Sequence, residues 1–192
     1  MYESYQNAYL EKMWNVLKDI NIIDSDERAY SFDEGVSRVV SEYERLKKTG
    51  NKIFFIGNGG SAGIASHQSA DYTKNGKLPA MTFFDPSLLT CISNDYGYEF
   101  VYEKPIEMFL QQDDILIAIS SSGQSKNILN GVSAAKKKGA FIITLSGFKE
   151  NNPLREMGDM NFYVDSECYG HVEIIHLIIS HIFLDTYMNT KL

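Results

Sequence analysis

Cysteine and positive charge are both scarce in this sequence. The 192 residues include two cysteines, Cys91 and Cys168, which lie far apart and form no Cys-x-x-Cys pair. This usage favours a reduced, cytoplasmic protein over a secreted one held together by disulfides. There are 18 Lys and Arg residues against 25 Asp and Glu, which leaves a net charge of −7. Because a nucleic-acid backbone attracts basic surface, this balance argues against a nucleic-acid partner.

Long apolar runs and targeting segments are missing as well. The apolar-rich stretch 174–184 is too short for a membrane span and carries two histidines, so we expect a buried helix there. The amino-terminal residues lack the basic and apolar regions of a signal peptide. We therefore expect no membrane partner. A chain of this length fits one domain and can bury a substantial core.

Apolar runs and helical patterns alternate through the middle of the chain. We predict strands at 52–56, 80–84, 115–119, 140–145 and 161–164, with helices at 61–74, 87–94, 99–109 and 125–138. Such alternation is typical of an α/β fold with three layers, α/β/α, and a parallel sheet of about five strands. Further helices are predicted at 1–22, 32–48 and 171–187, and a loop at 22–33. We thus expect a single domain over 1–192, with amino-terminal helices in 1–50, the α/β core in 51–165 and a carboxy-terminal helix in 166–192.

The predicted strand at 52–56 runs into a loop of small residues, Gly57-Asn58-Gly59-Gly60-Ser61, and a helix follows. Glycines let a backbone approach a ligand closely, and Ser61 can cap the helix or donate to a phosphate oxygen. An ordinary strand-to-helix turn with a cap explains this loop equally well. The loop is neither a P-loop nor a dinucleotide-binding fingerprint.

A second loop, from Ser120 to Ser125, has the sequence Ser-Ser-Ser-Gly-Gln-Ser and holds more hydroxyl groups than a helix cap requires. It follows the predicted strand 115–119, at the end where open α/β sheets bind ligands, and it precedes a helix whose amino terminus attracts anions. These features favour phosphate binding. Neither loop contains Lys or Arg, which favours a monophosphate over a nucleoside triphosphate with magnesium.

Candidate acid, base or metal-binding side chains lie on two predicted helices. His67 and Asp71 are four residues apart and share one helical face, and the 171–187 helix carries Glu173 and His181. Together these four would form a metal or acid–base cluster, although a histidine among isoleucines, such as His181, is more often a core residue. Glu173 and His181 are separated by about 12 Å of helix rise, so separate roles for them remain open.

Four motifs recur in the order and spacing of the SIS (sugar isomerase) domain family: Gly57–Ser61, Ser93–Gly97, Ser120–Ser125, and Val172–His176 followed by His181. Over nearly the whole chain, the sequence most resembles the phosphoheptose isomerases of this family, which convert sedoheptulose 7-phosphate to D-glycero-D-manno-heptose 7-phosphate. The resemblance implies a homotetramer with active sites at subunit interfaces. It also implies heptose synthesis for a bacterial cell-surface polysaccharide, either lipopolysaccharide or capsule.

The resemblance implies roles for individual residues too. Asp71 matches the family's catalytic base, and His181 matches its catalytic histidine. Substrate binding is implied for Asn58, Gly59, Gly60, Ser61, Asn94, Asp95, Ser120, Ser121, Ser122, Ser125 and Glu173. One zinc ion per active site, as bound by several members of the family, would be held by His67, Asp71, Glu173 and His181.

Two positions depart from the family's pattern. Asp71 stands where the family has glutamate, so its carboxylate is one methylene shorter, and Glu173 stands where the family has glutamine, which adds a negative charge. The alternatives are therefore an isomerase of another phosphosugar, or a non-catalytic SIS module that senses a sugar phosphate or binds a protein. The retained carboxylate and His181 favour catalysis.

Overall fold

Strands and helices alternate along the middle of the chain, as the sequence predicts. The computed structural model describes residues 2–190. Its strands are β1 (Asn21–Asp24), β2 (Ala29–Tyr30), β3 (Ile53–Gly57), β4 (Ala80–Thr82), β5 (Ile115–Ser120), β6 (Phe141–Gly147) and β7 (Met160–Val164). Its α-helices are α1 (Tyr2–Lys18), α2 (Phe32–Thr49), α3 (Gly60–Lys74), α4 (Pro86–Asp95), α5 (Glu103–Phe109), α6 (Lys126–Lys137) and α7 (Tyr169–Asn189). Short 3₁₀ turns cover η1 (Tyr98–Phe100) and η2 (Pro153–Glu156).

The sheet is mostly parallel. Its strand order is β2-β1-β7-β6-β5-β3-β4, and the five strands from β7 to β4 pair in parallel. This confirms the predicted α/β class and the five-stranded parallel sheet. It also brings the ends of β3 and β5 side by side, because Gly57 pairs with Ile119.

Two antiparallel strands extend the sheet beyond the prediction. We expected a loop at 22–33, which is wrong: β1 pairs antiparallel with β7, and β2 folds back on β1. The side chain of Asp24 closes the turn between them, because its carboxylate accepts hydrogen bonds from the backbone N–H groups of Asp26 and Arg28 and from the hydroxyl of Tyr30. Both strands are short and separated by polar turn residues, and β1 pairs with β7 far along the chain, so the local sequence pattern did not indicate them.

Two further predictions need adjustment. The helix expected over 1–22 ends at Lys18, because Asn21 already belongs to the sheet. The helix expected over 99–109 is a 3₁₀ turn followed by α5, which begins at Glu103. Pro105 stands in the first turn of α5, where its missing N–H leaves no helical hydrogen bond unmade.

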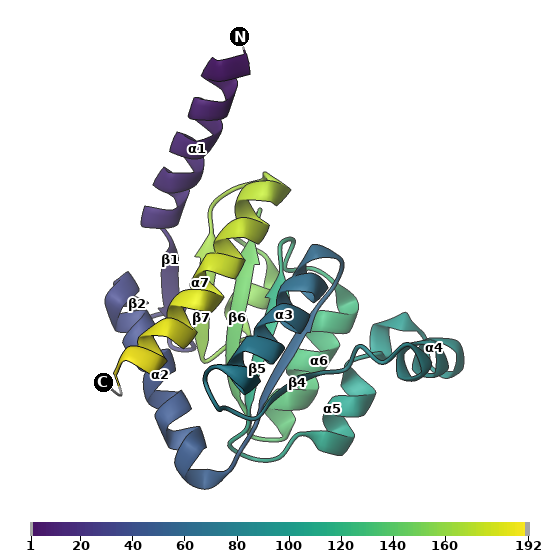
Figure 1. Ribbon diagram of the computed structural model, residues 1–192. Coiled ribbons are helices and arrows are strands. Elements are labelled where there is room, and N and C mark those ends of the chain that lie inside the picture. The colour runs from purple at the N-terminus through teal and green to yellow at the C-terminus, as the bar shows by residue number, and fades with distance from the viewer. Residues whose placement is uncertain (1, 191–192) are drawn as a thin grey trace.

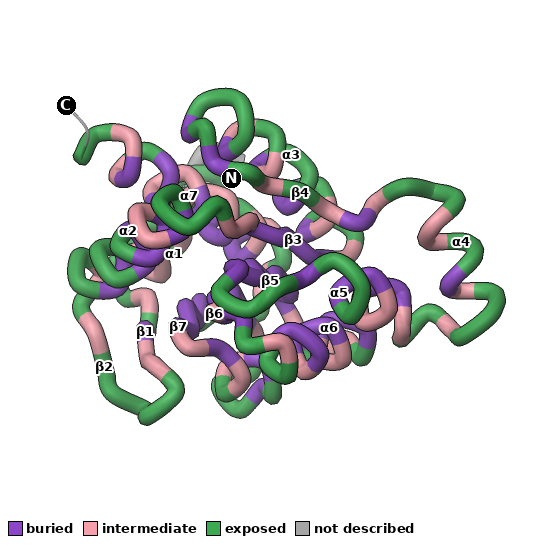
Figure 2. Tube along the Cα trace, turned by 90° about the horizontal axis from the view of Figure 1, so that it is seen from below, coloured by how far each residue is buried: buried purple, intermediate pink, exposed green. Residues whose placement is uncertain are grey.

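Helices cover both faces of the sheet, which confirms the three layers (Figure 1). Alternate residues of the buried strands point to opposite faces. Phe55 and Ile117 pack in the cluster formed with α2, α3 and α7, whereas Phe54 and Leu116 pack in the cluster formed with α5 and α6. Figure 2 shows the buried strands at the centre of the molecule. The first of these clusters holds α3 and α7 side by side on one face.

Two helices stand away from this body. In Figures 1 and 2, α4 lies apart from the layers, and α1 extends beyond the sheet in Figure 1. The apolar face of α1 leaves Leu10 and Trp14 more than half exposed, at 56% and 54%. Within residues 2–190, none of the helices combines the length and the apolar character that a membrane span needs.

Candidate active site

The two small-residue loops meet in one pocket at the carboxyl ends of β3 and β5. The pocket has a volume of about 240 Å³. It is lined by Asn58, Gly59, Gly60, Ser61, Ser120, Ser121, Ser122, Ser125, Tyr169 and Glu173. Eight of these ten residues belong to the two loops, so the structure brings together what the two motifs predict separately.

Two helix amino termini open onto this pocket. Gly59 precedes α3 and Ser125 precedes α6, and neither helix receives a side-chain hydrogen bond at its cap. The first backbone N–H groups of a helix have no partner within the helix, and the helix dipole places partial positive charge there. The pocket therefore favours an anion without any Lys or Arg among its lining residues.

The serine hydroxyls add donors to the same pocket. Ser121 is buried, and its Oγ has no hydrogen-bond partner among the described residues. The Oγ atoms of Ser120 and Ser122 accept hydrogen bonds from the N–H groups of Gly123 and Gln124, which leaves their own protons free to be donated outward. Hydroxyls in this arrangement suit the oxygens of a phosphate monoester.

A buried asparagine supports the serine loop from behind. Gly123 has a φ of +61°, and a Cβ at this position would overlap the side chain of Asn152. Asn152 is fully buried and donates to the carbonyl oxygens of Gly147 and Lys149. The backbone N–H of Leu154 also donates to the carbonyl of Gly123. Only glycine fits here, because a side chain would displace both the loop and its support.

Glu173 lies in the serine pocket and not with the histidines. Its carboxylate occupies the space beside Gly60, so a Cβ atom added to Gly60 would clash with it. Glu173 stands in the second turn of α7, and it brings a carboxylate acceptor next to the glycines of the first loop. A carboxylate at this point can accept hydrogen bonds from sugar hydroxyls.

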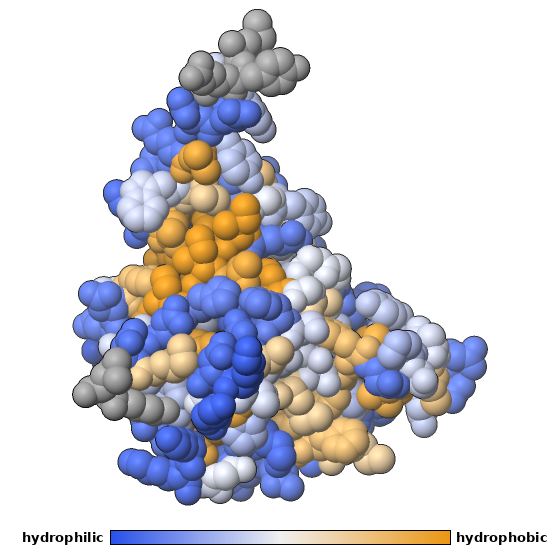
Figure 3. All heavy atoms as spheres, viewed as in Figure 1, coloured by the Kyte–Doolittle hydropathy of each residue, from blue (hydrophilic) through white to orange (hydrophobic). Residues whose placement is uncertain are grey.

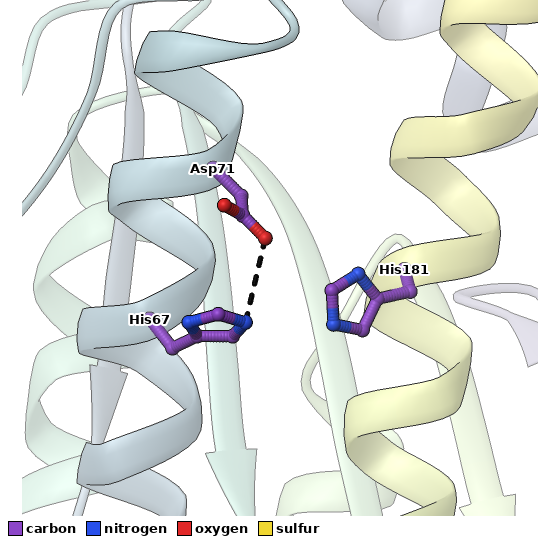
Figure 4. Close-up of side chains that lie close together, drawn as sticks. All are labelled: His67, Asp71 and His181. Carbon is purple, nitrogen blue, oxygen red and sulfur yellow. Dashed lines mark ion pairs between the residues drawn. The ribbon is translucent and has the colours of Figure 1, made fainter.

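His67, Asp71 and His181 form a second group, on the facing sides of α3 and α7 (Figure 4). Each offers a ligand atom, and these atoms lie within 4.8 Å of one another. His67 Nε2 lies 3.4 Å from Asp71 Oδ2, and the rings of His67 and His181 are 5.5 Å apart between centroids. His67 is exposed and the other two are half-buried, so the group is reachable from solvent.

This second group fits a zinc ion by its donors. Two imidazole nitrogens and one carboxylate oxygen are a ligand set that zinc accepts, and three protein ligands leave a coordination position for water or substrate. Glu173, the fourth ligand expected from the resemblance, is not part of the group: it lies in the serine pocket two turns earlier on α7.

The pocket and the three-residue group are joined along α3 and α7. Seven residues separate Gly60 from His67 on α3, which corresponds to about 10 Å of helix rise, and eight separate Glu173 from His181 on α7, about 12 Å. Because Glu173 contacts Gly60 and His181 lies beside His67, the two helices run in the same direction here. A ligand held by the serines would have to extend along these helices to reach the histidines.

Asn94 and Asp95 lie apart from the pocket within the chain. Both are exposed at the end of α4, where the Asn94 amide donates to the Asp95 carboxylate at 2.8 Å. Neither residue lines the serine pocket. In Figure 1, the helix that carries them lies well outside the layers.

Three polar residues near the loops were missed by sequence reasoning. Tyr169 lines the pocket at the start of α7, and Asn127 and Tyr98 form hydrogen bonds to Asn58. None of them belongs to a motif with a recognisable spacing. The sequence offered one indication, which was the polar residue Asn127 in the first turn of the helix after the serine loop.

Comparison with known proteins points to one family. Residues 33–147 match the family model described as the SIS domain. The chain is 35% identical over 190 residues to the phosphoheptose isomerase of Cytophaga hutchinsonii, a match that covers 93% of this chain and 96% of that protein. It is 34% identical over 153 residues to the phosphoheptose isomerase of Fusobacterium nucleatum, covering 77% of this chain and 78% of that protein.

The fold agrees with that of a solved relative. The structure of a phosphoheptose isomerase from Neisseria gonorrhoeae matches this chain with a TM-score of 0.85 and 25% identity. The match covers 98% of this chain and 100% of the other. The similarity therefore includes the helices at both ends of the sequence as well as the parallel sheet.

Proposed function

Because this chain belongs to the SIS domain family and, within it, to the phosphoheptose isomerases, we propose that it isomerises sedoheptulose 7-phosphate to D-glycero-D-manno-heptose 7-phosphate. The observation that carries the proposal is the continuity between the serine pocket and the group formed by His67, Asp71 and His181 along α3 and α7. The reaction would take place in the bacterial cytoplasm and supply heptose for lipopolysaccharide or capsule.

The phosphate would be held by the serines of the second loop and the uncapped amino terminus of α6. That binding energy would position the distant C1 and C2 atoms, because a substrate anchored by its phosphate presents these atoms to the catalytic side chains in a fixed orientation. Glu173, beside Gly60, would accept hydrogen bonds from hydroxyls of the sugar chain between the two groups. This arrangement suits a phosphorylated sugar whose reactive carbons lie far from its phosphate.

The proton transfers would be carried out by Asp71 and His181. Asp71 removes a proton from C1 of the ketose while the C2 oxygen gains a proton, which gives a cis-enediol. Loss of the C1 hydroxyl proton and return of a proton to C2 then give the aldose. His181 moves protons to and from the two oxygens. His67, at 3.4 Å from the Asp71 carboxylate, orients that base.

Zinc is the cofactor that we propose for this group, with His67, Asp71 and His181 as its ligands within the chain. When bound, the ion polarises the two substrate oxygens. Metal analysis of the purified protein tests this assignment. His67→Ala should lose the bound zinc, whereas Ser66→Ala, a change at the preceding exposed residue, should retain it. Equal zinc content in both variants would remove His67 from the ligand set.

A homotetramer would bury the apolar surface that the single chain leaves exposed. Figure 3 shows hydrophobic side chains gathered where α1 meets α7. Leu10 and Trp14 on α1 are more than half exposed, and Ile174 on α7 is 40% exposed. Patches of this kind mark interfaces between subunits. Light scattering should give a mass near four chains, and Trp14→Glu should lower it. A monomeric wild-type protein would contradict this assembly.

A second candidate function is the isomerisation of another phosphosugar. Its ground lies in the sequence, where Asp71 is shorter than the family's glutamate and Glu173 adds a negative charge. Either change would alter where the reacting carbons must lie relative to the phosphate.

One experiment separates these possibilities. Ketose phosphates of five to seven carbons are incubated with the protein in deuterated water, and NMR detects deuterium at C2 of the aldose. The main proposal expects turnover of sedoheptulose 7-phosphate, and strong loss with Asp71→Ala and His181→Ala but not with Ser66→Ala. Turnover of another ketose phosphate alone supports the second candidate. Binding of sugar phosphates without turnover of any would instead indicate a non-catalytic module.

A further inference from the structure

Asn58 and Asn127 form a reciprocal pair of hydrogen bonds between the two ligand loops. The Asn58 amide donates to Asn127 Oδ1 at 2.9 Å, and the Asn127 amide donates to Asn58 Oδ1 at 2.8 Å. Asn58 belongs to the first loop, and Asn127 is the second residue of α6, directly after the serine loop. The pair therefore spans the gap between the two segments that the pocket combines.

The orientation of both amides is fixed by their neighbours. The backbone N–H of Ile128 donates to Asn127 Oδ1 at 3.0 Å, so this atom must be the oxygen. The opposite atom of Asn127 is then a donor, and it can pair only with the oxygen of Asn58. The hydroxyl of Tyr98 donates to the same Asn58 oxygen at 3.1 Å. Both oxygens thus accept two hydrogen bonds each, and neither amide can turn without breaking the pair.

Tyr98 brings a third segment into this network. It opens the 3₁₀ turn η1, three residues after Asp95 at the end of α4. The neighbouring Glu99 carbonyl accepts a hydrogen bond from Asn130 of α6 at 3.0 Å. The network therefore links the first loop, the serine loop with α6, and the segment that carries Asn94 and Asp95. These are the three segments for which the resemblance implies substrate contacts.

We propose that Asn127 is a positioning residue that fixes the separation between the phosphate subsite and the sugar subsite. The proposal rests on the function proposed above. Asn127 is only 3% exposed and does not line the pocket, so it acts through Asn58. The serine loop has a support of its own, since Asn152 packs against Gly123 and the Leu154 N–H donates to the Gly123 carbonyl. Loss of Asn127 should therefore weaken a long phosphosugar much more than a free phosphate ion.

The helix α6 tolerates the substitution that tests this role. In Asn127→Ala, the N–H of Ile128 keeps its second acceptor, the Ser125 carbonyl at 3.0 Å. Asn127→Asp is a second variant: it retains the acceptor for Ile128 and loses the donor to Asn58, and a carboxylate in the first turn of a helix is favourable. Asn130→Ala is the matched control, because Asn130 lies on the same helix and bonds to η1 but not to Asn58.

Hydrogen exchange of the ligand-free protein tests the link itself. Asn127→Ala should speed exchange of residues 57–61 by about tenfold, because both part-buried hydrogen bonds to Asn58 are lost. Asn127→Asp should speed it less, because its carboxylate still accepts from the Asn58 amide. Exchange of 57–61 should be unchanged in Asn130→Ala. Unchanged exchange of 57–61 in both Asn127 variants would overturn the proposal, whatever the substrate of the protein.

Calorimetry with two ligands tests the consequence. In Asn127→Ala, which adds no charge beside the phosphate subsite, the Kd for inorganic phosphate should stay within about twofold of the wild-type value, whereas that for sedoheptulose 7-phosphate should rise about tenfold or more. A parallel loss of affinity for both ligands would overturn the positioning role. Wild-type protein that binds the sugar phosphate without turning it over would disprove the isomerase, and the same comparison of affinities would still decide the role of Asn127.

Discussion

The hydroxyl of Tyr72 donates a hydrogen bond to the backbone carbonyl of Ser180 at 3.0 Å, in the buried contact between α3 and α7. Asp71 and His181 are the neighbours of these two residues in the sequence. The Tyr43 hydroxyl lies 3.1 Å from that of Tyr72, and because Tyr72 uses its proton on Ser180, Tyr43 must be the donor. Burial raises the pKa of Tyr72 well above its usual value, so it stays a neutral donor at any working pH. The bond therefore holds Asp71 and His181 at a fixed separation.

Replacing Tyr72 by Phe should loosen this separation. We expect zinc affinity, measured by competition with a chelator, to fall about tenfold in Tyr72→Phe, because the two helices lose the hydrogen bond beside the ligands proposed above. Tyr43→Phe is the matched control, since it removes a hydroxyl from the same cluster and leaves the bond to Ser180 in place. Tyr43→Phe should lose about 1 kcal/mol of unfolding free energy, and Tyr72→Phe should lose more, because it also leaves the buried Tyr43 hydroxyl without its acceptor. Equal zinc affinities in the two variants would show that this contact does not set the geometry.

Replacement by alanine should have different effects at the two glycines in the first turn of α3. A Cβ at Gly60 would meet the Glu173 carboxylate, whereas a Cβ at Gly63 would meet nothing within 4 Å. Gly63→Ala should raise the unfolding free energy by about 0.5–1 kcal/mol, as alanine usually does in a helix, and leave ligand binding unchanged. Gly60→Ala should push the flexible Glu173 side chain into the pocket and weaken the binding of sugar phosphate. Calorimetric affinities of both variants check this, and equal affinities would contradict the placement of Glu173.

The repeating pattern of the middle of the chain was sufficient to predict the fold there. Buried parallel strands read as continuous apolar runs, so β3 and β5 could be placed to within a residue or two. The strands β1 and β2 could not be predicted, because both are short, β1 depends on a distant partner, and β2 pairs only with β1. Ile22 is buried only because β1 pairs with β7, some 140 residues away in the sequence, at Phe162.

The site shows the same division between local and distant determinants. The serine loop and the four-residue spacing of His67 and Asp71 are local, and both hold in the structure. The resemblance implied that Glu173 and His181 share one zinc ion, but Glu173 lies in the serine pocket and only His181 lies beside His67 and Asp71. The contact between Asn58 and Asn127 joins residues 69 positions apart, and that between Asn58 and Tyr98 joins residues 40 apart. No local spacing reports such contacts, so they could not be predicted.

A substitution at Gly123 tests how strongly phosphate binding depends on the conformation of the serine loop. Both Gly123 and Gly50 have positive φ angles, +61° and +78°, so alanine costs about 1–2 kcal/mol at either position. A Cβ at Gly50 meets nothing, whereas one at Gly123 overlaps Asn152. Gly123→Ala should therefore abolish measurable binding of inorganic phosphate, and Gly50→Ala should retain it. Retained binding in Gly123→Ala, measured by calorimetry, would mean that phosphate is held elsewhere.

His176 makes the stability of the fold depend on pH. Its ring is fully buried on α7, and Nε2 lies 3.1 Å from the Ser146 carbonyl at the end of β6. A carbonyl can only accept, so the neutral ring carries its proton on Nε2. Burial lowers the pKa of His176 from 6.5 to about 4. Below pH 6.5 the unfolded chain therefore binds a proton at this position and the folded chain does not.

The sign of the effect follows from that difference. The contribution of His176 to stability is complete above pH 6.5 and is lost as the pH falls towards 4, where the folded protein also takes up the proton. Over this range it should remove about 3 kcal/mol of unfolding free energy, at about 1.4 kcal/mol per pH unit. His176→Gln keeps a donor for Ser146 but cannot titrate, so its stability should start lower at neutral pH and fall less steeply. Urea unfolding at a series of pH values measures both slopes, and parallel curves would show that His176 is not the titrating group.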